Sequence, residues 1–119
     1  MSDTVAYKIL TGPQLEELVA AGIFAGAPVD IADGYIHMST AGQAQETLEK
    51  HFAGQADLHI AAVDLAALGD AVKWEVSRGG ALFPHIYAPL PLSAVVAHGP
   101  VETDADGALR LPDQRGQAG

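Results

Sequence analysis

The sequence predicts an α+β fold, in which helices and a largely antiparallel sheet share one domain. Three observations lead to this prediction. Strand-like and helix-like patterns alternate at first, and four or five strand-like segments then follow one another. Turn signals such as Gly69-Asp70 and Asp104–Gly107 separate those later segments. The length of 119 residues fits a single domain with a core of its own.

The first third of the chain is expected to form a strand, a helix and a loop. The strand lies at Ala6–Leu10, which is rich in β-forming residues. Pro13 suits the first turn of the helix that follows, and Gly22 is a natural stop. The apolar face of this helix comes from residues three and four apart, namely Leu15, Leu18 and Val19. Residues 23–34 are punctuated by Gly, Pro and Asp and are expected to form an ordered loop.

The segment Tyr35–Ser39 predicts a second strand with an unusual polar face. Because successive side chains of a strand point to opposite sides, its residues divide into two sets. One set is Tyr35, His37 and Ser39, and the other is Ile36 and Met38. A strand with one apolar face and one Tyr/His/Ser face is expected to contact something other than the hydrophobic core through its polar face.

A second helix is expected directly after this strand and is predicted to end at Gly54. Thr40 and Gln43 have the spacing of a capping box, in which each side chain bonds the other's backbone N–H. His37 and Ser39 therefore lie just before a helix N-terminus, where free N–H groups and the helix dipole favour anions.

The second half of the chain is expected to consist of strands and turns. The expected strands are Leu58–Leu65, Val72–Ser77, His85–Tyr87 and Ser93–His98, followed by a hairpin over 101–111. Alternation places Lys73, Glu75 and Ser77 on one face of their strand, with Trp74 facing the core. Arg78-Gly79-Gly80 is expected to be a mobile loop. Residues 1–111 are thus one domain, and 112–119 are expected to be a disordered tail.

Composition limits the classes of function. The formal net charge of −9 repels phosphate backbones, so no nucleic-acid partner is expected. The absence of cysteine removes disulfides, thiolate nucleophiles and Cys-based zinc sites. The polar, acidic start does not resemble a secretory signal, and no run approaches the roughly 20 apolar residues of a membrane span. We therefore expect a soluble, cytoplasmic protein without a membrane partner.

Residues able to do chemistry are concentrated in two segments, Asp33–Thr40 and Lys73–Tyr87. Together they hold two of the five histidines, the only tryptophan and two of the three tyrosines. The rest of the chain is mostly Ala, Leu, Val and Gly. This concentration predicts that the two segments fold together around one ligand site.

The same stretches resemble a bacterial family known as domain of unknown function 952, over residues 6 to about 98. The matching runs are Tyr7-Lys8-Ile9, Asp33–Thr40, Trp74-Glu75, Ser77–Gly80, Phe83–Tyr87 and Pro89-Leu90. The chain differs from the usual motifs of the family mainly at Tyr35 and Ile86. Two motifs in the right order make the resemblance quite specific.

This resemblance implies an ADP-ribosyltransferase-like fold, with two small, mostly antiparallel sheets and two helices around a cleft. In that class an early His or Arg holds a ribose of NAD, and a late Glu stabilises the ribosyl cation. The run Ile36–Thr40 is similar to the first element. Glu75 is a possible counterpart of the second, although it comes early in the strand order.

The residues themselves suggest roles and, for each, a plainer alternative. His85 suits a general acid or base, since histidine titrates near neutral pH, or is simply held by the Pro84 turn. Glu75 either acts on a glycosyl cation or pairs with a nearby cation. The expected ligand-binding residues are Tyr35, His37, Ser39, Thr40, Arg78 and Tyr87. The spacing of a zinc protease motif is absent, and no metal site is predicted.

Two hypotheses of function follow. The first is an ADP-ribosyltransferase-like enzyme that binds NAD or another nucleotide as its substrate. His37 and Ser39 would hold ribose and phosphate, a tyrosine would stack on a ring, and Arg78 would meet a phosphate. The second is a non-catalytic module that binds a small metabolite or a peptide in the same cleft. Substrate, catalysis and oligomeric state stay open at this point.

Overall fold

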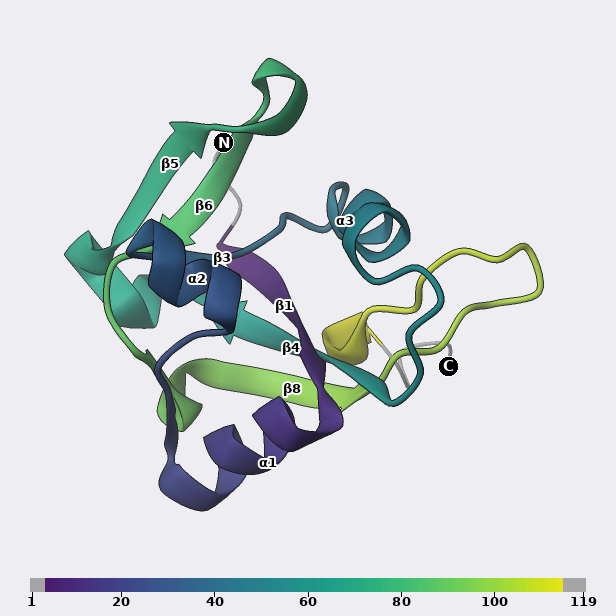
Figure 1. The fold of residues 1–119 in the computed structure, drawn as a ribbon, viewed down its shortest axis with the longest axis horizontal. Coiled ribbons are helices and arrows are strands. Elements are labelled where there is room, and N and C mark those ends of the chain that lie inside the picture. The colour runs from purple at the N-terminus through teal and green to yellow at the C-terminus, as the bar shows by residue number, and fades with distance from the viewer. Residues whose placement is uncertain (1–3, 115–119) are drawn as a thin grey trace.

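A computed structural model describes residues 4–114 and has an α+β architecture built from three small antiparallel sheets (Figure 1). The central sheet has the order β1-β4-β8, with β1 at Val5–Thr11, β4 at Leu58–Asp64 and β8 at Val95–Pro100. The second sheet has the order β3-β6-β5, with β3 at Ile36–His37, β6 at Leu82–Ile86 and β5 at Val72–Val76. A two-stranded sheet joins β2 (Ile23–Phe24) to β7 (Leu90–Pro91).

Both faces of β1 and β4 in the central sheet are buried, and a different helix packs on each face. Helix α1 (Gly12–Ala21) packs Leu18 into the cluster that includes Ala6 and Leu10 of β1. Helix α3 (Ala44–His51) packs Ala44 into a second cluster with Ile9 on the opposite face. Because successive strand residues point to opposite faces, β1 is buried along nearly its whole length. Figure 1 shows α1 and α3 on the two sides of β1 and β4.

The first expected helix is confirmed, and two side chains cap its start. The Thr11 side chain accepts a hydrogen bond from the Gln14 N–H at 3.3 Å, and the Gln14 Oε1 accepts from the Thr11 N–H at 2.9 Å. This is a complete capping box. Gly22 ends the helix in the left-handed region, at φ 74°. The expected apolar face is narrower than predicted, because Val19 is exposed.

The expectation of a loop over 23–34 is wrong, because that segment contains β2 and a short helix, α2 (Pro28–Asp33). Pro28 occupies its first turn. The side chain of Asp30 accepts from the Ala27 N–H at 2.8 Å, so a carboxylate within the helix caps its own start. Val29 and Ile31 are both exposed, which leaves α2 without the periodic apolar face that signals a helix.

The second half follows the expected order with shifted boundaries. Strand β8 begins two residues later than expected, after a turn over Leu92–Ala94. The segment expected to be a mobile loop forms a 3-10 turn, Arg78–Gly80. The hairpin over 101–111 reduces to one isolated bridge between Thr103 and Leu109. Pro112–Gln114 form a further 3-10 turn within the expected tail, and 115–119 lie outside the described residues.

Candidate functional site

The second sheet brings together the two segments that carry most of the chemistry. Strand β6 pairs with β3 on one side and β5 on the other. In these ladders His85 lies opposite His37 of β3 and opposite Lys73 of β5. Segments some forty residues apart therefore meet within one sheet. A bridge between Tyr7 and Ser39 connects this sheet to the edge of the central one.

Four rings from these segments pack against one another. Tyr35 stacks on His85, with ring centroids 4.1 Å apart and planes 23° apart. Its ring also lies 4.7 Å from His37 and 5.2 Å from Tyr87. The two imidazoles meet edge to face at 5.5 Å. Offset and edge-to-face contacts of this kind stabilise ring clusters beyond their buried area.

Glu75 holds His85 in a fixed orientation. Its Oε1 lies 2.7 Å from the Nδ1 of His85 and accepts a hydrogen bond from the Tyr87 hydroxyl at 2.8 Å. The bond with His85, ahead of the bond from Tyr87, lowers the pKa of the Glu75 carboxyl. The same contact with Glu75 is the main cause that raises the pKa of Tyr87. Because an ionised carboxylate only accepts, the Nδ1 of His85 is the donor.

The other ring nitrogen of His85 is buried, and the residue lines a small hollow. Within the described part of the chain, its Nε2 is buried and has no hydrogen-bond partner. His85 is one of the residues that line a hollow of about 120 Å³, together with Lys8, Ser39 and Thr47 among others. Buried polar atoms almost always have a partner, so this unpartnered nitrogen is an exception to the rule.

A buried carboxylate, Asp30, organises the other half of the site. Its oxygens lie 3.0 Å from the Nζ of Lys8 and 2.6 Å from the Nδ1 of His37. Asp30 is only 1% exposed. Burial opposes its ionisation, but the bond from His37 and the charge of Lys8 outweigh that cost and hold the pKa of Asp30 far below its usual range. Burial lowers the pKa of Lys8, against the attraction of Asp30.

His37 is held by carboxylates at both ring nitrogens. Besides the contact with Asp30, its Nε2 lies 2.9 Å from an oxygen of Asp33. Both contacts are hydrogen bonds at once only if both ring nitrogens carry a proton. Asp33 is exposed, so this side of the His37 ring lies near the surface. Neither Asp30 nor Lys8 was among the residues predicted for the site.

The remaining predicted residues differ in their accessibility. Ser39 is buried, and its Oγ lies 2.8 Å from the Oγ1 of Thr47. Thr40 forms half of the expected capping box, since its backbone N–H donates to Gln43 at 3.0 Å, while α3 begins four residues later. The backbone of Arg78 opens a 3-10 turn, and its side chain lies outside the described part.

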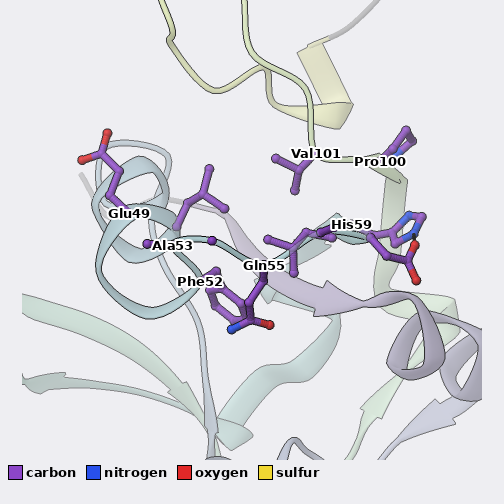
Figure 2. Close-up of a pocket in the computed structure, with 12 residues that line it drawn as sticks. Glu49, Phe52, Ala53, Gln55, His59, Pro100 and Val101 are labelled. Atoms are coloured by element: carbon purple, nitrogen blue, oxygen red, sulfur yellow. Dashed lines mark hydrogen bonds and ion pairs between the residues drawn. The ribbon is translucent and has the colours of Figure 1, made fainter.

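Two further hollows lie near the surface. One, of about 280 Å³, is lined by residues that include Tyr35, Tyr87 and Asp30. The other, of about 620 Å³, is an open groove between the end of α3 and the start of β4, with Phe52, His59 and Val101 on its walls (Figure 2). None of the predicted site residues lines this larger groove. The volume of a hollow therefore does not by itself identify the hollow that the predicted site residues line.

Within residues 4–114, no three His, Asp or Glu side chains gather in a way that suits a metal ion. Among the same residues, no helix has the length and apolar character needed to cross a membrane.

Comparison with known proteins identifies the family. No curated protein matches the chain. A crystal structure of the protein CC0527 from Caulobacter crescentus is 48% identical, with a TM-score of 0.81 over 90% of this chain and 94% of that one. A solution NMR structure of CC0527 is 47% identical, with a TM-score of 0.77 over 97% and 99% of the two chains. The profile described as "Protein of unknown function (DUF952)" matches residues 9–98. The chain therefore belongs to the DUF952 family.

Proposed function

We propose that the protein is an enzyme that uses His85 as a general acid–base, oriented by Glu75, on a small ligand bound at the adjoining hollow. One observation carries this proposal: Glu75 holds one ring nitrogen of His85, a residue that lines the hollow, and the other ring nitrogen is buried without a partner among the described residues. A carboxylate that fixes the orientation of an imidazole and stabilises its protonated form is a recurrent arrangement in acid–base catalysis.

NAD is the substrate that we propose for this enzyme, on the strength of the ADP-ribosyltransferase-like resemblance. A hollow of about 120 Å³ is smaller than the roughly 300 Å³ at which pockets for larger ligands begin. Only one end of a dinucleotide enters it, and the rest lies along the surface near Tyr35 and Tyr87. His37 and Arg78 are proposed to meet ribose and phosphate oxygens, with Arg78 at the opposite end of the β5–β6 hairpin from Tyr87. Glu75 is proposed to support cleavage of the glycosidic bond.

The proposal is tested by titrating the protein with NAD and measuring nicotinamide release. His85→Gln and Glu75→Gln are expected to lower the rate by about 10²- to 10⁴-fold, the usual contribution of a general acid–base. His98→Gln is the matched control, because His98 is an exposed histidine away from the site. Equal rates in all four proteins count against a catalytic role for His85.

Binding is tested separately from catalysis. His37→Ala and Arg78→Ala are expected to abolish the amide shifts or the thermal stabilisation caused by NAD, with the fold retained. Circular dichroism checks the fold, since His37 also supports Asp30. Unchanged NAD binding in both variants contradicts this assignment of ligand-binding residues.

A non-catalytic module that binds a small metabolite or a peptide is the second candidate. It is favoured by the burial of the His85 Nε2, which has almost no accessible surface, and by the carboxylates that already contact both nitrogens of His37. A binding shift without nicotinamide release supports this candidate over the enzyme.

A further inference from the structure

Strand β5 is an edge strand whose outer side carries open backbone groups. Among the described residues it pairs only with β6, and Figure 1 shows it at the margin of the molecule. Just beyond its two ends, the Tyr87 N–H donates to the Ala71 oxygen at 2.8 Å, and the Ser77 N–H donates to the Ala81 oxygen at 2.9 Å. Hydrogen-bonded positions in an antiparallel pair recur at every second residue. The odd-numbered residues of β5 therefore bond β6, and the even-numbered residues direct their backbone groups outward.

The outward groups belong to Val72, Trp74 and Val76, which also form the apolar face of β5. The Val72 N–H is already bonded to the Gly69 oxygen, so its C=O is the group that it offers to a partner. Trp74 is partly buried and packs on the core cluster, whereas Val76 is 67% exposed. Val76 lies opposite Leu82, which is 52% exposed. The apolar face thus continues past the core toward the end of the hairpin, beside the open edge.

The charges on the other face of β5 select one way of pairing two such edges. Because only the even-numbered residues direct backbone groups outward, an antiparallel second copy places Trp74 opposite Val72, Trp74 or Val76. The first register sets two Lys73 side chains against each other, and the last sets two Glu75 side chains against each other. Like charges directly opposite are destabilising. With Trp74 opposite Trp74, each Lys73 instead lies opposite Glu75 of the partner subunit, and opposite charges stabilise a cross-strand pair.

We infer that two copies of this chain associate through β5 in a two-fold symmetric dimer, with Trp74 opposite Trp74 of the partner subunit. A two-fold axis through this pair makes the interface self-complementary. The two Trp74 backbones exchange hydrogen bonds, and each Val76 N–H donates to the carbonyl oxygen of the partner subunit's Val72. The two three-stranded sheets become one continuous sheet, in which Val76 has apolar neighbours on both sides.

The dimer also completes the surroundings of the candidate site. Lys73 is exposed, and the side chain of Glu75 is 41% exposed. Residues opposite each other at positions without backbone bonds are the closest pairs of an antiparallel ladder, and Lys73 and Glu75 occupy such positions across the two-fold axis. Each copy therefore adds a cation beside the carboxylate that contacts His85 in the other copy. The pairing itself does not depend on any catalytic role of Glu75.

Sedimentation equilibrium over a concentration series tests the association. At about 0.15 M salt, charges more than about 8 Å apart are largely screened, which limits the repulsion between two chains of net charge −9. A monomer–dimer equilibrium is expected. Val76→Pro removes the outward N–H at a sheet edge, where proline is tolerated, and is expected to weaken dimerisation about tenfold or more.

Val76→Thr is the matched control, because it keeps the N–H and the β-branched shape and is expected to retain most of the affinity. Circular dichroism verifies that both variants are folded. A wild-type protein that is monomeric at every concentration overturns the inference, and so does equal dimerisation of the two variants.

Introduced thiols test the register, because the chain has no cysteine of its own. Lys73→Cys and Glu75→Cys are prepared as separate proteins and oxidised alone and as a mixture. In the proposed dimer these two positions have Cα atoms about 4.5 Å apart, within disulfide range, whereas two copies of the same position lie beyond about 7 Å. The mixture is expected to yield a cross-linked dimer with one chain of each kind. Cross-linking of either protein alone to the same extent, or none in the mixture, contradicts the proposed pairing.

Discussion

At the scale of single residues, the Asp30 carboxylate connects three segments far apart in the sequence. It pairs with Lys8 of β1, accepts from the Ala27 N–H before α2, and accepts from both the backbone and the ring of His37. Removing one partner of a buried ion pair leaves the other charge unpaired, which is more costly than never having the pair. Asp30 is therefore expected to be the most sensitive polar residue near the site.

Asp30→Asn is expected to lower the free energy of unfolding by about 3–5 kcal/mol, because it leaves the Lys8 ammonium buried without a counter-charge. Urea unfolding measures the change. Asp70→Asn is the control, since Asp70 is exposed, and a change within about 0.5 kcal/mol is expected there. A loss of unfolding free energy in Asp30→Asn as small as that in Asp70→Asn would show that the buried network contributes nothing to stability.

The alternation of residues along strands predicts part of the geometry of the candidate site, whose function stays a proposal. That pattern places Glu75 on the polar face of β5, and in the structure this side chain contacts His85 and Tyr87. No alternating pattern in the sequence marks Asp30 as a residue of the candidate site. It lies in a segment that reads as a loop, and its partners Lys8 and His37 come from β1 and β3, so only the tertiary fold reveals its role.

At the scale of elements, α1 and α2 differ in what holds them and in whether they could be predicted. Helix α1 has a capping box and buries Leu18, both of which leave a pattern in the sequence. Helix α2 is only six residues long and exposes Val29 and Ile31. Its start is held by the side chain of Asp30, which bonds the Ala27 N–H. Short helices held by polar contacts escape a search for apolar periodicity.

Thr11→Ala is expected to lower the free energy of unfolding by about 1 kcal/mol, because α1 loses the hydroxyl that accepts from the Gln14 N–H. Thr11→Ser keeps the hydroxyl and is expected to retain most of the stability. Chemical denaturation of the three proteins under the same conditions provides the comparison. A Ser variant as unstable as the Ala variant would mean that the methyl group of Thr11, and not the cap, is responsible.

At the scale of the whole molecule, the site lies where separate sheets join. The backbones of Tyr7 and Ser39 exchange hydrogen bonds of 2.7 and 2.9 Å, which tie the segment after β3 to the edge of the central sheet. Lys8, on the same strand β1, reaches Asp30 next to β3. The positions of His85 and His37 therefore depend on the global fold. Partial unfolding would separate both histidines from their partners.

The stability of the whole protein is expected to fall in acid, in part through Asp30. Its pKa in the folded state lies below the unfolded value, so its contribution is complete above that unfolded value, about 3.9. The contribution is lost as the pH falls through the lower, folded value. Unfolding free energies measured from about pH 7 to about pH 3 are expected to decline below about pH 4. Asp30→Asn is expected to show a shallower decline, and an equal slope in both proteins would contradict this assignment.

The central claim is that Glu75 orients His85 by accepting from its Nδ1, which leaves a lone pair on the buried Nε2. The ring ¹⁵N spectrum of His85 tests this claim most directly, at a pH where the ring is neutral. The account predicts a proton on Nδ1 and none on Nε2, with Glu75→Ala giving a mixture of the two forms. A proton on Nε2 in the unmodified protein, unchanged by Glu75→Ala, would contradict it.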